Sequence, residues 1–450
     1  MKMTINNFEL TNDMQKVWDL TLTPGGGHVF VTGKAGSGKT TFLKYLKDNS
    51  PKNLIIAAPT GVAAVNAGGV TLHSLFQFPL SPIPPGTELD DDLSKQKRAL
   101  LRKMEILVID EISMVRPDIM DAVDWRLRSI RKSDRPFGGV QVIMFGDIYQ
   151  LPPVIRESDW KLLGPYYKSP YFFSATVWTK TGFEVVELSK VFRQTNQDFI
   201  DVLNRLRTYQ TTDDDFKMMS VAAGRVFSPE ITMKLIHLCA LKDEASKINS
   251  WMLGTTGLTT YTASSSGKFP ESAKPCPDKI QLRPGARVMS LINNLPKGYY
   301  NGSLGTVVAC QSDEVMVLFD NGVTEVISEN KWDNNEYEVR NKQVWSVCVG
   351  TYSQIPLIPA WAITIHKSQG LTFDYVNLHI SNVFSPGQLY VALSRCRSFD
   401  GVTTNMPVSP KMIIPDDYLL EFSDYLKDNN NYYYRGKKID NDSSNTEDKE

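Results

Sequence analysis

Residues 33–40 read GKAGSGKT and have the spacing G-x-x-x-x-G-K-[ST]. The glycines allow backbone N–H groups to approach phosphate oxygens, Lys39 would reach the outer phosphates of a nucleotide, and the Thr40 hydroxyl suits Mg²⁺. The apolar run 28–31 precedes this loop, and the amphipathic stretch 41–47 follows it. Because the motif requires a strand, a loop and a helix in this order, we predict a phosphate-binding loop at the positive end of a helix.

Two adjacent carboxylates, Asp110 and Glu111, follow the apolar run 106–109. A short β-branched run of this kind is typical of a strand that is buried on both faces. Adjacent carboxylates are usually surface charge, but these end an apolar strand about 70 residues after the loop. We therefore expect Asp110 to hold Mg²⁺, directly or through water, and Glu111 to polarise an attacking water molecule.

Two further strand-like runs also end in polar residues. The segment 53–64, NLIIAAPTGVAA, reaches Thr60, and the segment 140–154, VQVIMFGDIYQLPPV, reaches Asp147 and Gln150. Open parallel sheets bind their ligands at the carboxyl ends of the strands. The first half of the chain is therefore predicted to be an α/β domain whose ligand site lies at that edge of the sheet.

A predicted helix between these strands has an apolar stripe with helical spacing at Ile119, Val123, Leu127 and Ile130. Its other faces carry Arg126, Arg128, Arg131 and Lys132. Such a run of positive charge is either a solvated helix face or a functional basic surface. The sequence leaves both interpretations open.

The composition of the chain limits the classes of protein it can be. With 450 residues, 42% hydrophobic and 22% charged, we expect two to four globular domains. The net charge of −1 gives no nucleic-acid signal, so any such binding must come from local patches. The five cysteines are scattered and lack zinc spacing, so neither a disulfide framework nor a structural metal is expected. Without an apolar signal core or a run of about 18 apolar residues, the protein is expected to be soluble and cytoplasmic.

A phosphate loop alone does not reveal what the nucleotide energy is used for. A GTPase needs an Asn-Lys-x-Asp guanine reader, and residues 330–333 fit that pattern. They lie about 290 residues beyond the loop in a β-rich segment, so we treat the match as chance. A small-molecule kinase or a protein-remodelling ATPase would use one nucleotide core, whereas a nucleic-acid motor needs two cores with the nucleotide between them.

The second half also has α/β patterns, at 184–194, 233–252 and 373–381, but it has no glycine–lysine loop. It contributes arginines instead, above all Arg193 and Arg395. An arginine from a facing domain can stabilise the charge on a transferring phosphate. The alternative is that both arginines form ordinary surface ion pairs.

Together these motifs resemble those of the Pif helicases, in the 5′-to-3′ branch of helicase superfamily 1, which are relatives of RecD. The matching segments occur in family order: TGKAGSGKT, APTGVAA, ILVIDEISM, GDIYQLPPV, VFRQ, TIHKSQG and YVALSRCRS. Residues 118–141 also resemble the signature that separates Pif proteins from other relatives. The resemblance runs from about residue 8 to 405. Because no eukaryote-like N-terminal extension is present, we expect a compact bacterial or phage-type member.

The resemblance implies specific roles at the nucleotide. Gln15 would lie by the adenine, Gln150 would sense the γ-phosphate, and Gly370 would lie near the nucleotide. The implied nucleotide-binding residues are Gln15, Gly33, Ala35, Gly36, Ser37, Gly38, Lys39, Thr40, Thr41 and Gly370. Mg²⁺ would be held by Thr40 and Asp110. The implied catalytic residues are Lys39, Glu111, Gln150, Arg193 and Arg395.

The resemblance also implies a single-stranded DNA path. Its expected residues, which would contact phosphates and sugars, are Thr60, His73, Ser74, Thr364, His366 and Lys367. His73 on its own would more often be an ordinary loop or core histidine, but the string TLHSLF after APTGVAA favours the functional interpretation. Residues 76–85, FQFPLSPIPP, resemble a short inserted hairpin that wedges the duplex apart.

The expected fold class is α/β, with two RecA-like parallel-sheet cores, an inserted wedge hairpin and an inserted small SH3-like β-barrel. The barrel is expected because short β-runs alternate with Asn-Gly turns in that part of the chain. The expected bounds are 1–185 for the first core with the wedge region at about 72–100, 186–294 and 353–425 for the second core, and 295–352 for the barrel. A tail at 426–450 is expected to be disordered, although its YYYRGKK string could touch nucleic acid.

The implied function is that of an ATP- and Mg²⁺-dependent 5′-to-3′ DNA helicase. It would translocate on single-stranded DNA and unwind forked or structured DNA, including G-quadruplexes or RNA–DNA hybrids, in repair, recombination or telomere maintenance. We expect a nucleoid-associated protein that is monomeric in solution and has no membrane partner. Two alternative functions stay open. One is an ATPase that is stimulated by single-stranded DNA and remodels nucleoprotein without unwinding, and the other is a protein-directed ATPase. A preference for RNA over DNA also stays open.

Overall fold

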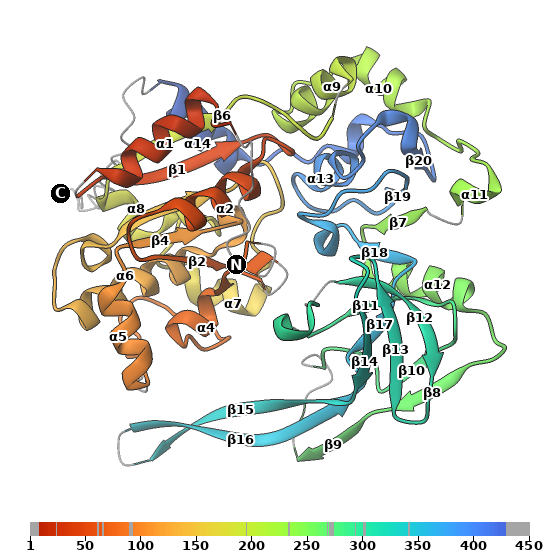
Figure 1. Cartoon of the computed structure of the whole chain (residues 1–450). Helices are drawn as coiled ribbons and strands as arrows, with labels where there is room; N and C mark the ends of the chain where they lie inside the picture. The colour runs from red at the N-terminus through yellow and green to blue at the C-terminus, as the bar shows by residue number, and fades with distance from the viewer. Residues whose placement is uncertain are drawn as a thin grey trace, which may run out of the picture.

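The computed structural model describes residues 9–428 except positions 24, 61–62, 65–66, 90–92, 195, 233–234, 268, 270–273, 293, 300–302 and 341–342. The expected disordered tail therefore lies, from residue 429 onward, outside the described residues, as does its YYYRGKK string. The described chain forms two parallel α/β sheets and a β-rich region (Figure 1).

The first sheet is parallel throughout and has the strand order β3-β2-β4-β5-β1-β6. Its strands are β1 (His28–Gly33), β2 (Leu54–Ala58), β3 (Val70–Thr71), β4 (Ile106–Ile109), β5 (Gln141–Phe145) and β6 (Phe183–Leu188). Alternate residues of β4 face opposite cores: Leu107 and Ile109 pack into one apolar cluster, Ile106 and Val108 into another. This two-sided burial explains the continuous apolar run, and it confirms the α/β prediction for the first half.

Helices cover both faces of this sheet. Helices α1 (Asn12–Leu22) and α2 (Lys39–Asn49) pack on one face, and α6 (Pro117–Arg131) and α8 (Thr176–Lys180) pack on the other. The last helix, α14 (Asp417–Asp428), also packs on the second of these faces through Leu419 and Phe422. We expected this segment in the second core, but the sequence pattern of an amphipathic helix does not say which core its apolar stripe meets.

The basic residues of α6 serve mainly to hold the first core together. Arg126 is buried, and Arg128 pairs with Asp124 at 2.9 Å. Arg131 donates hydrogen bonds to the backbone carbonyls of Leu101, Arg102 and Met104. These three arginines therefore mainly stabilise the fold of the first core. They form neither a fully solvated helix face nor a free basic surface.

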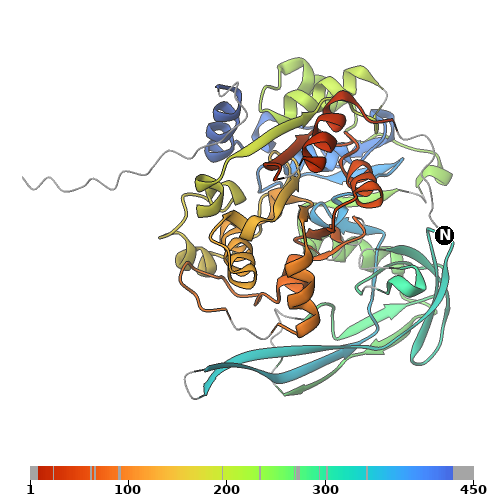
Figure 2. The same cartoon turned by 60° about the vertical axis from the view of Figure 1, so that its left-hand side comes forward.

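The second parallel sheet has the order β18-β7-β19-β20. Its strands are β7 (Ile236–Cys239), β18 (Ala362–Thr364), β19 (Val376–His379) and β20 (Val402–Thr404). The helices that accompany it are α9 (Gln197–Arg207), α10 (Asp213–Ser220), α11 (Pro229–Thr232), α12 (Lys242–Leu253) and α13 (Gln388–Ser394). Figures 1 and 2 show this second layer beside the first, with α9 and α10 at its outer end.

The β-rich region contains a five-stranded antiparallel sheet with the order β14-β13-β12-β11-β17. Its strands are β11 (Arg287–Ser290), β12 (Leu304–Cys310), β13 (Glu314–Phe319), β14 (Thr324–Ser328) and β17 (Leu357–Pro359). Strands β8 (Thr259–Thr262), β9 (Ser264–Gly267) and β10 (Lys279–Leu282) adjoin it, and Tyr261 and Ile280 share its core. The region is therefore wider than the expected bounds of 295–352, because β11 lies outside those bounds and pairs with β12 inside them, and β17, also outside, pairs with β11.

A long hairpin, β15 (Asn330–Arg340) and β16 (Gln343–Gln354), leaves this region and runs toward the first core. In Figures 1 and 2 it passes along the side of the first core that carries α4 (Leu72–Phe76) and α5 (Lys95–Lys103). The remaining helices are α7 (Glu157–Leu163) and short 3-10 turns at Ile112–Met114, Pro136–Gly139, Phe172–Ser174, Leu295–Lys297, His366–Ser368, Phe399–Gly401 and Pro410–Met412. Within the described residues, no helix combines the length and apolarity needed to cross a membrane.

Candidate active site

The phosphate loop connects the end of β1 to the start of α2, as the sequence predicted. Gly36 and Gly38 have φ values of 80° and 82°, in the left-handed region that favours glycine. A Cβ atom at Gly36 would lie 2.4 Å from the Cβ atom of Arg193, so the loop also needs glycine where the second half of the chain approaches it. Lys39 Nζ donates to the carbonyl oxygens of Gly33 at 2.6 Å and Lys34 at 2.8 Å, and burial lowers its pKa to about 8.

The two carboxylates at the end of β4 lie beside this loop. Burial and the neighbouring Glu111 raise the pKa of Asp110 to about 7. Burial also raises the pKa of Glu111, against the opposing effect of Lys39. The Asp110 carboxylate and the Thr40 hydroxyl line the same cleft and offer the hard oxygen ligands that Mg²⁺ prefers. The residues present therefore fit the magnesium ion that the sequence motif implies.

Two arginines from the second half face the same carboxylates. Arg395 is 2% exposed, and its Nε donates to the Val391 carbonyl at 2.9 Å. Arg193 donates to the Ser394 carbonyl at 3.0 Å. Within the described part of the chain neither guanidinium pairs with a carboxylate, so the alternative of surface ion pairs is not what the structure has. Burial, and then the charge of Arg193, lower the pKa of Arg395 to about 9.

These groups line one cleft of about 1050 Å³ between the two parallel sheets. From the expected nucleotide site it gathers Ala35, Gly36, Ser37, Gly38, Lys39, Thr40, Thr41, Asp110, Glu111, Gln150, Arg193, Gly370 and Arg395. From the expected DNA path it gathers Thr60, Thr364, His366 and Lys367. One continuous cleft thus brings together residues that the sequence assigned to two different ligands.

Four expected site residues do not line the cleft. Gln15 is exposed on α1 and donates to Asp19 at 2.8 Å, and Gly33 is buried at the end of β1. His73 and Ser74 lie on α4, away from the cleft lining. His73 packs edge-on against Phe78, and burial with the nearby Arg116 lowers its pKa.

One cleft residue, Gln369, was not singled out from the sequence. Its Nε2 donates to Glu111 Oε2 at 2.9 Å and to Gln150 Oε1 at 3.2 Å, so it joins the two sheets at the carboxylates. It is 8% exposed, and among the described residues its Oε1 atom has no hydrogen-bond partner. The sequence offered one signal for it. Gln369 lies in the segment TIHKSQG, between the residues expected to contact single-stranded DNA and Gly370, which is expected to lie near the nucleotide.

A second bridge crosses between the sheets beneath the cleft. The backbone N–H of Ala35 donates to Tyr390 Oη at 2.8 Å, and Tyr390 Oη donates to Asp147 Oδ2 at 3.1 Å. Asp147 also forms an ion pair with Arg207 at 2.9 Å. Asp147, which the sequence placed only at a strand end, therefore links the phosphate loop to α13 and α9.

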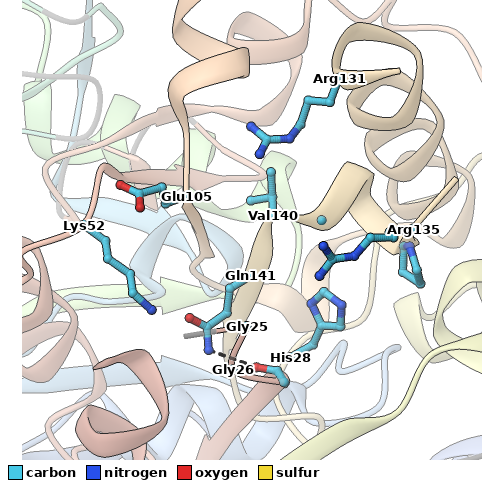
Figure 3. Close-up of a pocket in the computed structure, with 12 residues that line it drawn as sticks. Gly25, Gly26, His28, Lys52, Glu105, Arg131, Arg135, Val140 and Gln141 are labelled. Atoms are coloured by element: carbon cyan, nitrogen blue, oxygen red, sulfur yellow. Dashed lines mark hydrogen bonds between the residues drawn. The ribbon is translucent and has the colours of Figure 1, made fainter. Parts of the chain in front are cut away.

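The opposite edge of the first sheet has a separate cavity of about 450 Å³ (Figure 3). Several of the polar side chains that line it hold the local backbone. Gln141 Nε2 donates to the carbonyls of Leu20 and Gly27, Lys52 donates to those of Thr21 and Thr23, and His28 Nδ1 accepts from the backbone of Val142. The cleft between the sheets therefore remains the candidate active site.

Comparison with known proteins identifies the family. A model of the PIF1-like helicases matches residues 9–216. The ATP-dependent DNA helicase Pif1 of Bdellovibrio bacteriovorus is 33% identical over 433 residues, which cover 93% of each chain. The chain belongs to the PIF1-like helicase family. The Xenopus laevis helicase PIF1 is 34% identical over 88% of this chain, and the chain spans about three-fifths of the length of such vertebrate relatives.

Solved PIF1-like helicases share the fold. Bacteroides Pif1 bound to single-stranded DNA is 50% identical, with a TM-score of 0.88 over 95% of this chain and 99% of that one. A structure that describes unwinding at forked double-stranded DNA by two coordinating Pif1 helicases has a TM-score of 0.86 at 49% identity. Unliganded Pif1 from Bacteroides has a TM-score of 0.69 at 49% identity. The conformation of this chain is thus more similar to that of the relative bound to single-stranded DNA than to that of the unliganded relative.

Proposed function

We propose that this chain is an ATP-dependent DNA helicase that moves along single-stranded DNA in the 5′-to-3′ direction and unwinds duplex or structured DNA ahead of it. The observation that carries the proposal is the single cleft, in which the phosphate loop, two carboxylates and two arginines from the opposite sheet adjoin Thr364 and His366. Relatives named as ATP-dependent DNA helicases, and a relative bound to single-stranded DNA, support it.

At the nucleotide, Lys39 would hold the outer phosphates, and Thr40 and Asp110 would hold Mg²⁺. When bound, Mg²⁺ would neutralise charge on the phosphate oxygens. Glu111 accepts a proton from the attacking water, which its raised pKa suits. Arg193 and Arg395, whose charges no carboxylate among the described residues neutralises, stabilise the charge that develops on the transferred phosphate.

Gln369 is a positioning residue in this scheme. Its N–H groups orient Glu111 and Gln150, and its unpartnered Oε1 can accept a hydrogen bond from the second O–H of the attacking water. Because Gln369 belongs to the second sheet, Glu111 is correctly oriented only when the two sheets close. Hydrolysis is thereby tied to the closed cleft.

The DNA path is assigned to Thr60, His73, Ser74, Thr364, His366 and Lys367. The strand would pass over the cleft at Thr364 and His366, whose ring lies parallel to that of Phe384 at 6.4 Å, and continue toward His73 and Ser74 on α4. Backbone contacts of this kind do not depend on base sequence, which a motor requires. Opening one base-pair step costs about 1.4 kcal/mol of stacking, which is small enough for one ATP to drive.

The wedge is assigned to residues 76–85. Leu80 in this segment is 87% exposed. Asp118 of α6 accepts a hydrogen bond from the Ile83 backbone at 3.0 Å and pairs with Arg116 at 2.7 Å. A firmly anchored segment with an exposed apolar side chain suits a wedge between DNA strands. We further assign the two parallel sheets as RecA-like cores and the antiparallel sheet as an SH3-like barrel.

The test is unwinding of duplexes with a 5′ or a 3′ single-stranded tail in the presence of ATP and Mg²⁺. We expect the 5′-tailed duplex to be unwound and the 3′-tailed duplex to stay intact. Strand-stimulated ATP turnover without unwinding of either substrate would support the nucleoprotein remodeller instead. Turnover that responds to neither DNA nor RNA would contradict both proposals and favour a protein-directed ATPase.

A further inference from the structure

A group of metal-ligating side chains lies apart from the cleft, between the second sheet and α12. Cys239 and His379 end the neighbouring strands β7 and β19, where they are paired in register, and Glu244 lies in the first turn of α12. One ligand atom from each of these three residues lies within 4.8 Å of the other two. Cys239 is fully buried, and the other two side chains are about one-fifth exposed (Glu244 22%, His379 16%).

His379 lies between His237 and Glu244. Its Nε2 lies 3.0 Å from His237 Nδ1, and its Nδ1 lies 2.9 Å from Glu244 Oε1. When His379 Nε2–H donates to His237, the lone pair of Nδ1 points toward Glu244. The position between Nδ1 and Glu244 then takes either a proton on Nδ1 or a metal ion.

Two observations favour a metal ion over a single extra proton in that position. Glu244 Oε2 is buried and, among the described residues, has no hydrogen-bond partner, and a proton on His379 would serve only the other oxygen. The thiol of Cys239 also lies within the same 4.8 Å. A sulfur, an imidazole nitrogen and a carboxylate oxygen together suit zinc or a similar divalent transition metal, and they do not suit Mg²⁺ or Ca²⁺.

We propose that Cys239, Glu244 and His379 bind one Zn²⁺ ion, with solvent as the fourth ligand. His237 would then accept the Nε2–H of His379 and fix its orientation, as groups behind a metal-bound histidine commonly do. Ligands of tetrahedral zinc lie about 3.5 Å apart, so the 2.9 Å between His379 Nδ1 and Glu244 Oε1 must widen by about 0.5 Å, while the Cys239 sulfur already lies within 4.8 Å of both residues. The sequence did not predict this site because Cys239 and Glu244 lie more than 130 positions before His379 and the three have no characteristic zinc spacing.

The location suggests what the ion would stabilise. Cys239 is followed directly by Ala240, Leu241 and Lys242, which line the cleft, and it pairs in register with Thr364 on β18. A metal ion at Cys239 would tie β7, β19 and α12 together behind this wall. The site thus lies behind the wall of the cleft and outside the hydrolytic machinery.

The test uses the untagged full-length chain, equilibrated with Zn²⁺ and dialysed, with zinc measured by mass spectrometry. We expect one zinc per chain and a melting temperature about 5 °C above that of the chelator-treated protein. Cys239→Ser and Glu244→Gln should both lose the zinc, while Cys310→Ser, a half-buried cysteine of β12, should keep it.

Loading with Co²⁺ gives a second readout that does not depend on stability. We expect the visible bands of tetrahedral cobalt and a near-ultraviolet sulfur-to-cobalt band, the latter absent in Cys239→Ser. Zinc at background level in the wild-type chain, or zinc and cobalt spectra that Cys239→Ser and Glu244→Gln leave unchanged, would overturn the proposal. The cluster would then be an ion pair between a protonated His379 and Glu244.

Discussion

The chemistry of the cleft depends on a few buried charges. Asp147 and Glu111 favour the charged form of Lys39, whereas Glu111 raises the pKa of Asp110 and Asp147 raises the pKa of Glu111. A nucleotide with Mg²⁺ would add both a cation for the carboxylates and an anion for the lysine and arginines. The free site is therefore electrostatically unfavourable in a way that its proposed ligand relieves.

Replacing Glu111 with glutamine should separate binding from hydrolysis. The amide keeps the size of the side chain but cannot accept a proton, so we expect ATP affinity to be retained and turnover to fall by about 10²–10⁴-fold. Nucleotide-binding fluorescence and single-turnover hydrolysis measure the two quantities. Turnover within a few-fold of wild type would remove Glu111 from the water-activating role.

The demand for Mg²⁺ should rise as the pH falls through about 7. The pKa of Asp110 is raised to about 7, so below that pH the carboxyl is mostly protonated and protons compete with the metal. We expect the Mg²⁺ concentration for half-maximal turnover to be about tenfold higher at pH 6 than at pH 8. Asp110→Asn should abolish this pH dependence, and a Mg²⁺ requirement that is constant across this range would contradict the assignment of Asp110.

Gln369→Ala should shift the pH profile of hydrolysis as well as its rate. The Gln369 hydrogen bond lowers the pKa of Glu111, so its loss should move the acidic limb of the kcat profile to higher pH and reduce kcat about tenfold or more. Gln197→Ala, which changes an exposed glutamine of α9, is the matched control. A lower kcat with an unmoved profile would indicate a merely structural role for Gln369.

At the scale of elements, the fully buried strands were the most predictable features. Residues 106–109 and 141–145 are buried on both sides, and their continuous apolar runs made them visible. Short strands such as β11 were missed because their pairing with β12 and β17 depends on distant segments. The packing of α14 on the first core was missed for a similar reason, because its apolar stripe does not show which core it packs against.

The site was predicted to a comparable extent. The residues on strand ends and on the phosphate loop meet in one cleft because parallel strands present their carboxyl ends at one edge. His73 and Ser74 lie on a helix instead, and the structure does not bring them to the cleft. Gln369 was overlooked because its role arises only from contacts with Glu111 and Gln150, more than 200 positions away.

In the loop that follows β18, Thr364 and His366 should contact DNA and should not contact the nucleotide. Combining Thr364→Ala with His366→Ala should weaken strand binding and strand-stimulated turnover about tenfold or more while ATP affinity stays unchanged. Removal of backbone contacts loses affinity uniformly across DNA sequences. Fluorescence anisotropy with oligonucleotides of different sequence measures this, and a collapse of ATP affinity would show that the loop lies on the nucleotide side.

At the scale of the whole molecule, polar contacts join the two parallel sheets at the cleft. Gln369 contacts Glu111 and Gln150 there, and Tyr390 bridges Ala35 and Asp147. Polar contacts of this kind can be broken and re-formed when domains move relative to each other. The bound nucleotide and the bound strand would both favour the closed arrangement, which makes their binding energetically linked.

The rate of ATP turnover as single-stranded DNA is added is the most direct test of this linkage. We expect single-stranded DNA to accelerate turnover at least tenfold in a saturable way, and the nucleotide to tighten DNA binding in return. A turnover rate that is the same with and without single-stranded DNA would contradict it.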